Sequence, residues 1–253
     1  MRIGMMINYS SSFHDSVDQV VELEKAGLDV VWIPEAYSFD AVSQVGYLAA
    51  KTERVQIGTG ILNVYSRTAA AIAQTAAGCD LISDGRYILG LGARGPQVVE
   101  GFHGVPYEKP VKRIAEYIDV VRMAIRREKL DYDGVTVQVP LPEGLGTGLG
   151  KPLKLINHLP RPSSPIWWAS LMPLAVSETA RRAEGWLPTS YLPEKIDEIW
   201  GEPLAKGMAE RPAELGPLQI SMGAMVAIGD EYDGEGADAV LDRGRDNTAL
   251  YGG

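Results

Sequence analysis

Four polar side chains stand directly after separate apolar runs of the chain, at positions where they could take part in chemistry. They are Glu35, Asn63, Arg94 and Ser170. A carboxylate can accept or donate a proton, an amide can hydrogen-bond a ligand, and a guanidinium can bind an anion. If the apolar runs are parallel strands of a barrel, their carboxyl ends meet at one rim, so we expect these side chains to converge there.

Histidine offers the other acid–base candidate. His14 lies in the loop after the first apolar run, on the face where the polar side chains are expected, and it could act as a general acid or base. A solvated histidine at a helix entry is the alternative. The chain has three histidines, His14, His103 and His158, and their spacing predicts no metal site. No Ser-His-Asp or Cys-His arrangement is apparent, so the catalytic candidates are Glu35 and His14.

Strand-like and helix-like apolar patterns alternate along the chain. Short apolar runs predict buried strands, and apolar residues spaced three and four apart predict amphipathic helices between them. Asp15 or Ser16 is expected to cap the first helix, and Gly27 to end it. The expected strands are residues 3–9, 30–33, 55–62, 87–92, 166–170, 186–190 and 220–228, and the clearest helices are 111–125 and 176–183.

This alternation predicts an α/β fold whose parallel strands are joined by right-handed crossovers. A closed barrel and an open doubly wound sheet both satisfy it. The first strand-to-helix connection lacks G-x-G-x-x-G, which disfavours a dinucleotide-binding sheet, and 253 residues match the roughly 250 of one (β/α)8 barrel of the TIM type. We therefore expect a single barrel domain over residues 1–253, with an insertion near 129–164 that begins as a hairpin and lies over the carboxyl-terminal face.

Composition limits the partners and the location. The formal net charge of −9 disfavours binding to nucleic acid. No apolar run approaches the ~20 residues that a membrane span needs. A single cysteine, Cys79, cannot form an internal disulfide; it fits a buried thiol in a reducing compartment. We expect a cytoplasmic protein that binds a small molecule.

Four segments, in this order and spacing, carry a resemblance to a known family. They are G-L-D-V-V-W-I-P-E at 27–35, T-E-R-V-Q-I-G-T-G-I-L at 52–62, I-S-D-G-R-Y-I-L-G-L-G at 82–92 and G-P-Q-V-V-E-G-F-H-G-V-P-Y at 95–107. The chain resembles the luciferase-like monooxygenase superfamily, and most of all its branch that uses coenzyme F420. The resemblance implies a barrel that holds a flavin or deazaflavin ring across the carboxyl ends of its strands.

The resemblance also implies which residues contact that cofactor. The third strand is expected to end in a bulge with a non-prolyl cis peptide between Gly60 and Ile61, behind the ring; an ordinary glycine bulge is the alternative. Gly92 would let the ligand approach the backbone, or would only allow close packing. The segment 169–172 precedes a helix whose free N–H groups could bind the cofactor phosphate. The expected cofactor-binding residues are Thr59, Gly60, Ile61, Asn63, Gly92, Ala93, Arg94, Ala169, Ser170, Leu171, Met172 and Gly185.

Two positions depart from the family pattern. Some deazaflavin dehydrogenases carry a catalytic histidine one position after the acidic residue, and here that position is Ala36. Their proton-transfer mechanism therefore does not carry over to Glu35, which is expected near the ring or else as a solvated carboxylate. Arg94 replaces a usually small residue, and it could bind an anionic group or be a surface charge. We expect Arg67, Arg94 and Lys112 to form a basic rim for the polyglutamate tail of coenzyme F420.

These features predict an oxidoreductase that transfers a hydride between coenzyme F420 and an organic substrate that the sequence does not identify. The alternatives are a luciferase-like monooxygenase that uses FMN, and a non-catalytic barrel subunit. We expect a homodimer. The chain shows seven apolar runs of strand type and no eighth after residue 228, followed by a helical stretch over 237–251. We expect that a carboxyl-terminal strand is missing, because the chain is shortened or because its remainder is disordered or supplied separately.

Overall fold

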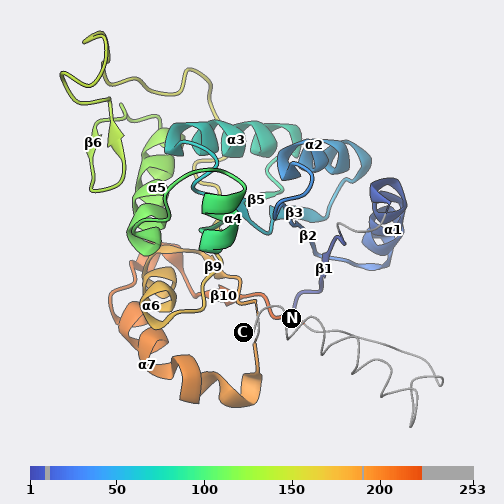
Figure 1. Ribbon diagram of the computed structural model, residues 1–253. Coiled ribbons are helices and arrows are strands. Elements are labelled where there is room, and N and C mark those ends of the chain that lie inside the picture. The colour runs from blue at the N-terminus through green and yellow to red at the C-terminus, as the bar shows by residue number, and fades with distance from the viewer. Residues whose placement is uncertain (9–11, 190, 224–253) are drawn as a thin grey trace.

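The computed structural model describes residues 1–8, 12–189 and 191–223, and eight of their strands form one curled, all-parallel sheet with helices around its outside (Figure 1). The pairing order is β1-β2-β3-β5-β8-β9-β10, and β4 pairs with β5. The view runs along the curl from the carboxyl ends of the strands. The strands are β1 (Gly4–Met6), β2 (Val30–Ile33), β3 (Gln56–Thr59), β4 (Leu62–Asn63), β5 (Tyr87–Gly92), β8 (Ile166–Trp168), β9 (Gly185–Trp186) and β10 (Gln219–Ile220).

The sheet is an open half-barrel over the described residues, because β1 pairs there only with β2 and β10 only with β9. The Arg2 guanidinium spans the opening and donates to Oε1 of Gln219 at 3.1 Å. A barrel-type α/β fold is therefore confirmed, and an open doubly wound sheet is excluded. Of the expected seventh strand, only its first residue, Ile220, lies in β10; residues 224–228 and the expected helix over 237–251 fall outside the described residues.

Helices cover the outer side of the curl, and each begins where local sequence favours it. Ser12 caps the first helix by accepting from the N–H of Asp15, so the expected caps at Asp15 and Ser16 were wrong by a few residues; Gly27 ends that helix with a φ of 110°, as expected. The helices are α1 (Phe13–Ala26), α2 (Ala41–Lys51), α3 (Ala69–Ile82), α4 (Pro96–Gly101), α5 (Pro110–Ile125), α6 (Pro173–Arg182) and α7 (Ile196–Ala209). No helix in the part of the chain described is long and apolar enough to cross a membrane.

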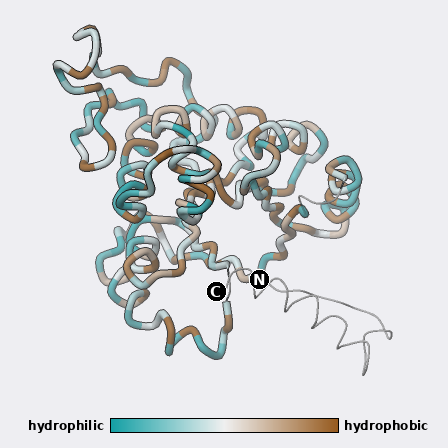
Figure 2. Tube along the Cα trace, viewed as in Figure 1, coloured by the Kyte–Doolittle hydropathy of each residue, from teal (hydrophilic) through white to brown (hydrophobic). Residues whose placement is uncertain are grey.

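Strand alternation divides the core into two layers. The larger layer packs the outward residues of the strands against the helices, and Figure 2 shows hydrophobic residues along the central strands. The inner layer contains Trp32 and Trp167, whose ring centroids lie 5.1 Å apart. Each indole lies over a glycine: a Cβ at Gly58 would be 2.3 Å from the Trp32 ring, and a Cβ at Gly185 would be 2.0 Å from the Trp167 ring. The tryptophans therefore require glycine on the neighbouring strands.

Two strand predictions needed correction. The first strand is not buried along its length: Met6 is 58% exposed, because β1 has a neighbour on one side only among the described residues. The expected strand over 55–62 is two strands, β3 and β4. A cis peptide between Gly60 and Ile61 separates them, and that prediction is confirmed.

The insertion contains the expected hairpin, formed by β6 (Tyr132–Asp133) and β7 (Gln138–Val139). Its contacts place it beside α5 rather than over the carboxyl-terminal face. The tip of the hairpin donates to the Glu116 carboxylate of α5. At its other end Arg161 forms an ion pair with the buried Asp80 of α3 and donates to the carbonyl of Tyr87, at the amino end of β5. The expected position was wrong because these long-range contacts have no signal in the local sequence.

Candidate active site at the carboxyl ends of the strands

The ends of β4, β5 and β8 bring one group of the predicted residues together. Asn63 and Gly92 are register partners, and the N–H of Ala169 donates to the carbonyl of Leu91 at 2.9 Å. A Cβ at Gly92 would lie 2.9 Å from the side chain of Ile61 and 3.6 Å from Cβ of Ala169. Ile61, Asn63, Gly92 and Ala169 therefore surround one small region at the mouth of the curl, the carboxyl-terminal opening of the half-barrel.

Asn63 carries an unsatisfied hydrogen-bond donor in this region. Its Oδ1 accepts from the N–H of Tyr65 at 3.1 Å, which fixes the orientation of the amide. Its Nδ2 is buried and has no hydrogen-bond partner among the described residues. A buried donor without a partner costs about 1–3 kcal/mol, so such an atom is a candidate for binding the acceptor of a ligand.

The start of α6 offers a second feature, at the end of β8. Met172 stands at the N-cap without a side-chain hydrogen bond, and Pro173, which has no N–H, follows it; the first-turn donors of α6 that lack an intrahelical acceptor are therefore the N–H groups of Leu174 and Ala175. Ser170 does not point its hydroxyl at them. That hydroxyl is buried against Oγ1 of Thr179 at 2.8 Å, inside α6. The carbonyl of Leu171 accepts from the Trp200 indole of α7 at 2.8 Å, which anchors the segment to a helix that the sequence did not predict.

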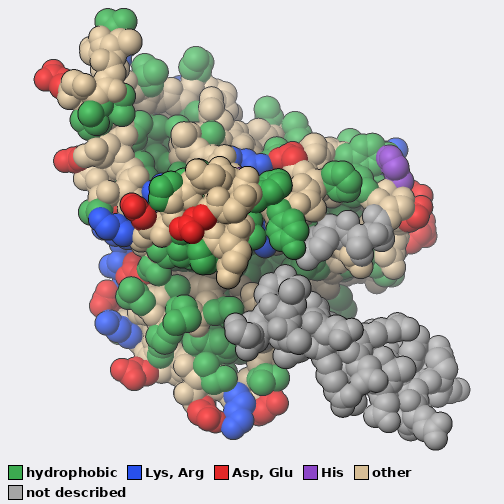
Figure 3. Space-filling model, in the orientation of Figure 1, with side chains coloured by type: hydrophobic (Ala, Val, Ile, Leu, Met, Phe, Trp, Pro, Cys, Tyr) green, Lys and Arg blue, Asp and Glu red, His purple; other side chains and the backbone are tan. Residues whose placement is uncertain are grey.

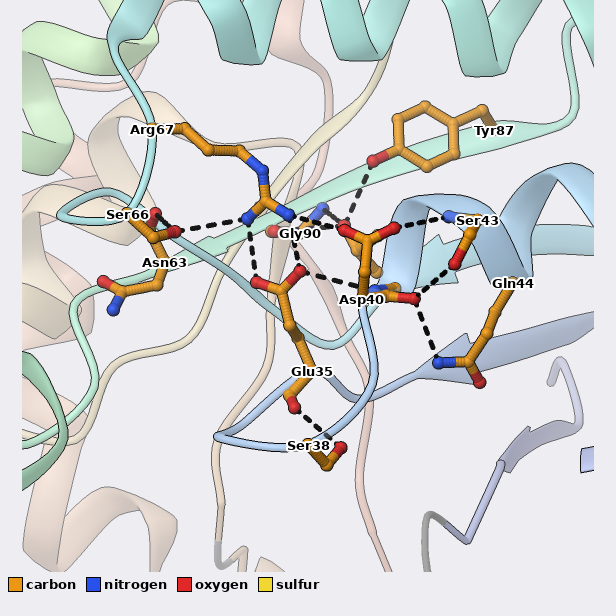
Figure 4. A network of polar contacts seen from close by, with 12 residues as sticks. Glu35, Ser38, Asp40, Ser43, Gln44, Asn63, Ser66, Arg67, Tyr87 and Gly90 are labelled. Atoms are coloured by element: carbon orange, nitrogen blue, oxygen red, sulfur yellow. Dashed lines mark hydrogen bonds and ion pairs between the residues drawn. The ribbon is translucent and has the colours of Figure 1, made fainter. Parts of the chain in front are cut away.

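Glu35 faces the outer layer and forms an ion pair with two parallel hydrogen bonds (Figure 4). Nη1 of Arg67 donates to its Oε2 at 2.8 Å, and Nη2 donates to its Oε1 at 2.6 Å. The N–H of Ala41 at the start of α2 also donates to Oε1, at 3.3 Å. Nη2 of Arg67 reaches Asp40, the N-cap of α2, at 2.8 Å. The carboxylate of Glu35 thus joins the starts of α2 and α3. Through Arg67 and the Ser66 hydroxyl, which donates to the backbone carbonyl of Asn63 at 2.9 Å, it is linked to the backbone of Asn63 (Figure 4).

This network shifts the pKa values of Arg67 and Asp40. Hydrogen bonding to Glu35 raises the pKa of the Arg67 guanidinium, and its attraction to Asp40 adds to the effect. Burial would raise the pKa of Asp40, but hydrogen bonds from Ser43 and the charge of Arg67 outweigh burial, and the pKa is lowered. Arg67 and Asp40 are therefore held in their charged forms at neutral pH.

The network also changes the expected basic rim. Arg67 is occupied by two carboxylates, and Lys112 lies 3.5 Å from the Glu116 carboxylate. Arg94 is partly buried with a φ of 57°, in the loop after β5. Glu35 and Asp40, two acids that flank one short loop, indicate in the sequence that a basic partner is needed there. The sequence does not indicate that this partner is Arg67.

The remaining candidates lie elsewhere. His14 is exposed on α1, with its ring 5.6 Å from that of Tyr47 in α2, and it is not brought to Asn63. Thr59 is fully buried and links β3 to β5, since its Oγ1 accepts from the N–H of Gly90 at 3.0 Å. Ala93 packs against the outer layer, and Gly185 lies under Trp167. Gly60 is partly exposed beside Trp32, at the end of β3.

Comparison with known proteins identifies relatives that align with most of this chain. A family description, luciferase-like monooxygenase, matches residues 1–242. A Mycobacterium tuberculosis protein, whose name assigns it provisionally to the coenzyme F420-dependent oxidoreductases, is 36% identical over 236 residues. That alignment covers 91% of this chain and 68% of the relative.

Solved structures agree on the fold. The coenzyme F420-dependent tetrahydromethanopterin reductase from Methanopyrus kandleri superposes with a TM-score of 0.77 at 19% identity, over 92% of this chain and 68% of that one. The oxygenating constituent of a Baeyer-Villiger monooxygenase from Pseudomonas putida, in complex with FMN, superposes with a TM-score of 0.70 at 15% identity, over 100% of this chain and 76% of that one. At these identities the likeness concerns the fold alone.

Proposed function

This chain belongs to the luciferase-like monooxygenase family, and from that premise we propose that it is an oxidoreductase that transfers a hydride between coenzyme F420 and an organic substrate. The proposal rests above all on the buried, unpartnered Nδ2 of Asn63 at the mouth of the curl. The relative with 36% identity supports the choice of cofactor, because its name includes coenzyme F420.

The residues at the mouth fit a planar ring with a phosphate tail. Nδ2 of Asn63 would donate to an acceptor on the ring, and Ile61, Gly92 and Ala169 would provide an apolar surface without bulky side chains. The first turn of α6 would bind the phosphate through its N–H groups. When bound, the deazaflavin ring would supply the hydride chemistry, and the protein would supply orientation and a water-poor surface.

Glu35 serves in this proposal as a positioning residue. Its carboxylate already accepts from Arg67 and Ala41, so proton transfer from it to a substrate would require the ion pair to break. By joining the starts of α2 and α3 it holds the loops that follow β2 and β4 around the mouth. His14 has no place in the mechanism, since its ring lies on the exposed side of α1.

A titration of the purified protein with coenzyme F420 and, separately, with FMN tests the proposal. Binding is followed by quenching of tryptophan fluorescence, because Trp32 lies beside Gly60 in the inner layer. We expect F420 to bind more tightly than FMN. Tighter binding of FMN would replace the proposal with an FMN-dependent monooxygenase, and saturation by neither cofactor would favour a non-catalytic barrel.

A further inference from the structure

Two exposed aromatic side chains from different loops meet on the carboxyl-terminal face. Tyr37 lies in the loop after β2 and is 68% exposed, and Phe102 ends α4 and is 64% exposed. Their ring centroids are 6.4 Å apart, with an angle of 51° between the planes. A cluster of exposed apolar side chains indicates a binding surface more often than an isolated exposed apolar side chain does.

Both rings are carried by segments with fixed backbones. The N–H of Ser38 donates to the carbonyl of Glu35 at 3.0 Å, so the turn that holds Tyr37 is tied to the ion pair with Arg67. The N–H of Phe102 donates to the carbonyl of Val98 at 3.0 Å and completes the last turn of α4. The two loops follow the carboxyl ends of β2 and β5, which places the ring pair on the same face as Asn63 and Gly92.

The surroundings of the ring pair favour a neutral ligand. Arg67, in the loop after β4, forms ion pairs with both Glu35 and Asp40, which flank the loop of Tyr37. Glu100, one residue before the end of α4, is exposed, and the chain as a whole carries a net charge of −9. Figure 3 shows hydrophobic side chains beside α4 on this face. An anionic substrate would meet repulsion here, whereas an apolar ring would gain contact area.

We infer that Tyr37 and Phe102 bind the substrate of the proposed oxidoreductase, and that this substrate is an uncharged organic molecule with an apolar, planar ring system. That this ligand is a substrate rests on the proposed function. The binding of an apolar ring to Tyr37 and Phe102 does not depend on the cofactor. The rings would stack against the ligand or enclose its edge, above the region where Asn63, Gly92 and Ala169 meet.

The test uses the purified protein without cofactor and two probes with the same ring, neutral 2-naphthol and anionic 2-naphthoate, titrated by probe fluorescence. Tyr37→Ala and Phe102→Ala are compared with Phe39→Ala. Phe39 is 72% exposed in the same loop as Tyr37, and its ring contacts no other aromatic ring within the described part of the chain. We expect 2-naphthol to bind more tightly than 2-naphthoate, and each of the first two variants to weaken it about fivefold, with Phe39→Ala close to the unmodified protein.

Absence of saturable 2-naphthol binding, tighter binding of 2-naphthoate, or an equal loss in Phe39→Ala would overturn the inference. If the rings instead pack against a second copy of the chain, Phe102→Ala would lower the sedimenting mass and leave 2-naphthol binding unchanged, which also overturns it. The F420 titration is read separately. Failure there with the expected 2-naphthol results would remove the proposed function and leave the apolar ring site standing.

Discussion

The guanidinium of Arg67 and the carboxylate of Glu35 are joined by two hydrogen bonds, of 2.8 and 2.6 Å, between the loops that follow β4 and β2. Their side chains are 20% and 12% exposed. A planar guanidinium matches a carboxylate in this paired geometry, and lysine cannot reproduce it. The ion pair therefore sets the relative positions of two loops at the mouth, one of which carries Tyr37.

Arg67→Ala is expected to lower the free energy of unfolding by about 3 kcal/mol, because it leaves the Glu35 carboxylate largely buried without its partner. Arg67→Lys should recover only part of this loss. Urea unfolding followed by tryptophan fluorescence measures both. The control is Lys25→Ala, which removes an ion pair whose side chains are 67% and 72% exposed and should cost less than about 0.5 kcal/mol. Equal effects of Arg67→Ala and Lys25→Ala would contradict the structural role.

Asn63→Asp separates the two functions of the Asn63 amide. The variant keeps an oxygen for the N–H of Tyr65 but replaces the unpartnered Nδ2 donor with an acceptor. We expect coenzyme F420 to bind at least about tenfold more weakly, since a buried acceptor would face an acceptor on the ring. Asn63→Ala removes both groups and should also lower the free energy of unfolding by about 1 kcal/mol. Unchanged F420 binding in Asn63→Asp would remove Asn63 from the cofactor site.

Glu116 makes the hairpin of the insertion sensitive to acid. Its buried carboxylate accepts from the N–H groups of Val135, Thr136 and Val137 and from the Thr136 hydroxyl. Burial alone would raise the pKa of Glu116, but these hydrogen bonds outweigh it and lower the pKa. A lowered pKa in the folded state means that the ionised group stabilises the hairpin above its ordinary pKa of 4.5, and that this stabilisation is lost as the pH falls through the lower value.

Amide hydrogen exchange at residues 135–137 measures the effect. At pH 7, Glu116→Gln should speed exchange roughly thirtyfold, which corresponds to about 2 kcal/mol of local opening. The difference from the unmodified protein should shrink as the pH falls below 4.5. Glu143→Gln, at an exposed position of the same insertion, is the control at each pH. A difference that persists undiminished in acid would show that ionised Glu116 does not hold the hairpin.

Two glycines should respond in opposite directions to alanine. A Cβ at Gly90 would lie 1.8 Å from the carbonyl oxygen of Thr59 on the neighbouring strand, so Gly90→Ala should lower the free energy of unfolding by at least about 3 kcal/mol. A Cβ at Gly78 of α3 would meet nothing within 4 Å, so Gly78→Ala should raise it by about 0.5–1 kcal/mol. Urea unfolding of both variants provides the comparison. Tolerance of Gly90→Ala would mean that β3 and β5 are not packed as closely as described.

Local sequence determined the alternating strands and helices of this protein. Apolar runs and helical spacing predicted β2, β5 and α5 to within a residue or two, because strand and helix periodicities are local properties of the chain. The order of four motifs predicted the family, the barrel-type fold and the cis peptide at Gly60–Ile61. Asn63 was likewise predicted at the mouth, since it directly follows a buried strand.

Only the tertiary structure decided which partners the side chains beyond the strand ends bind. The sequence could not show that Glu35 binds Arg67, 32 positions later. Nor could it show that Tyr37 contacts Phe102, or that the insertion packs against Glu116 and Asp80. Each of these contacts joins residues that are distant in the chain. Their partners are selected by the curvature of the sheet and by the need to pair buried charges, which no local pattern contains.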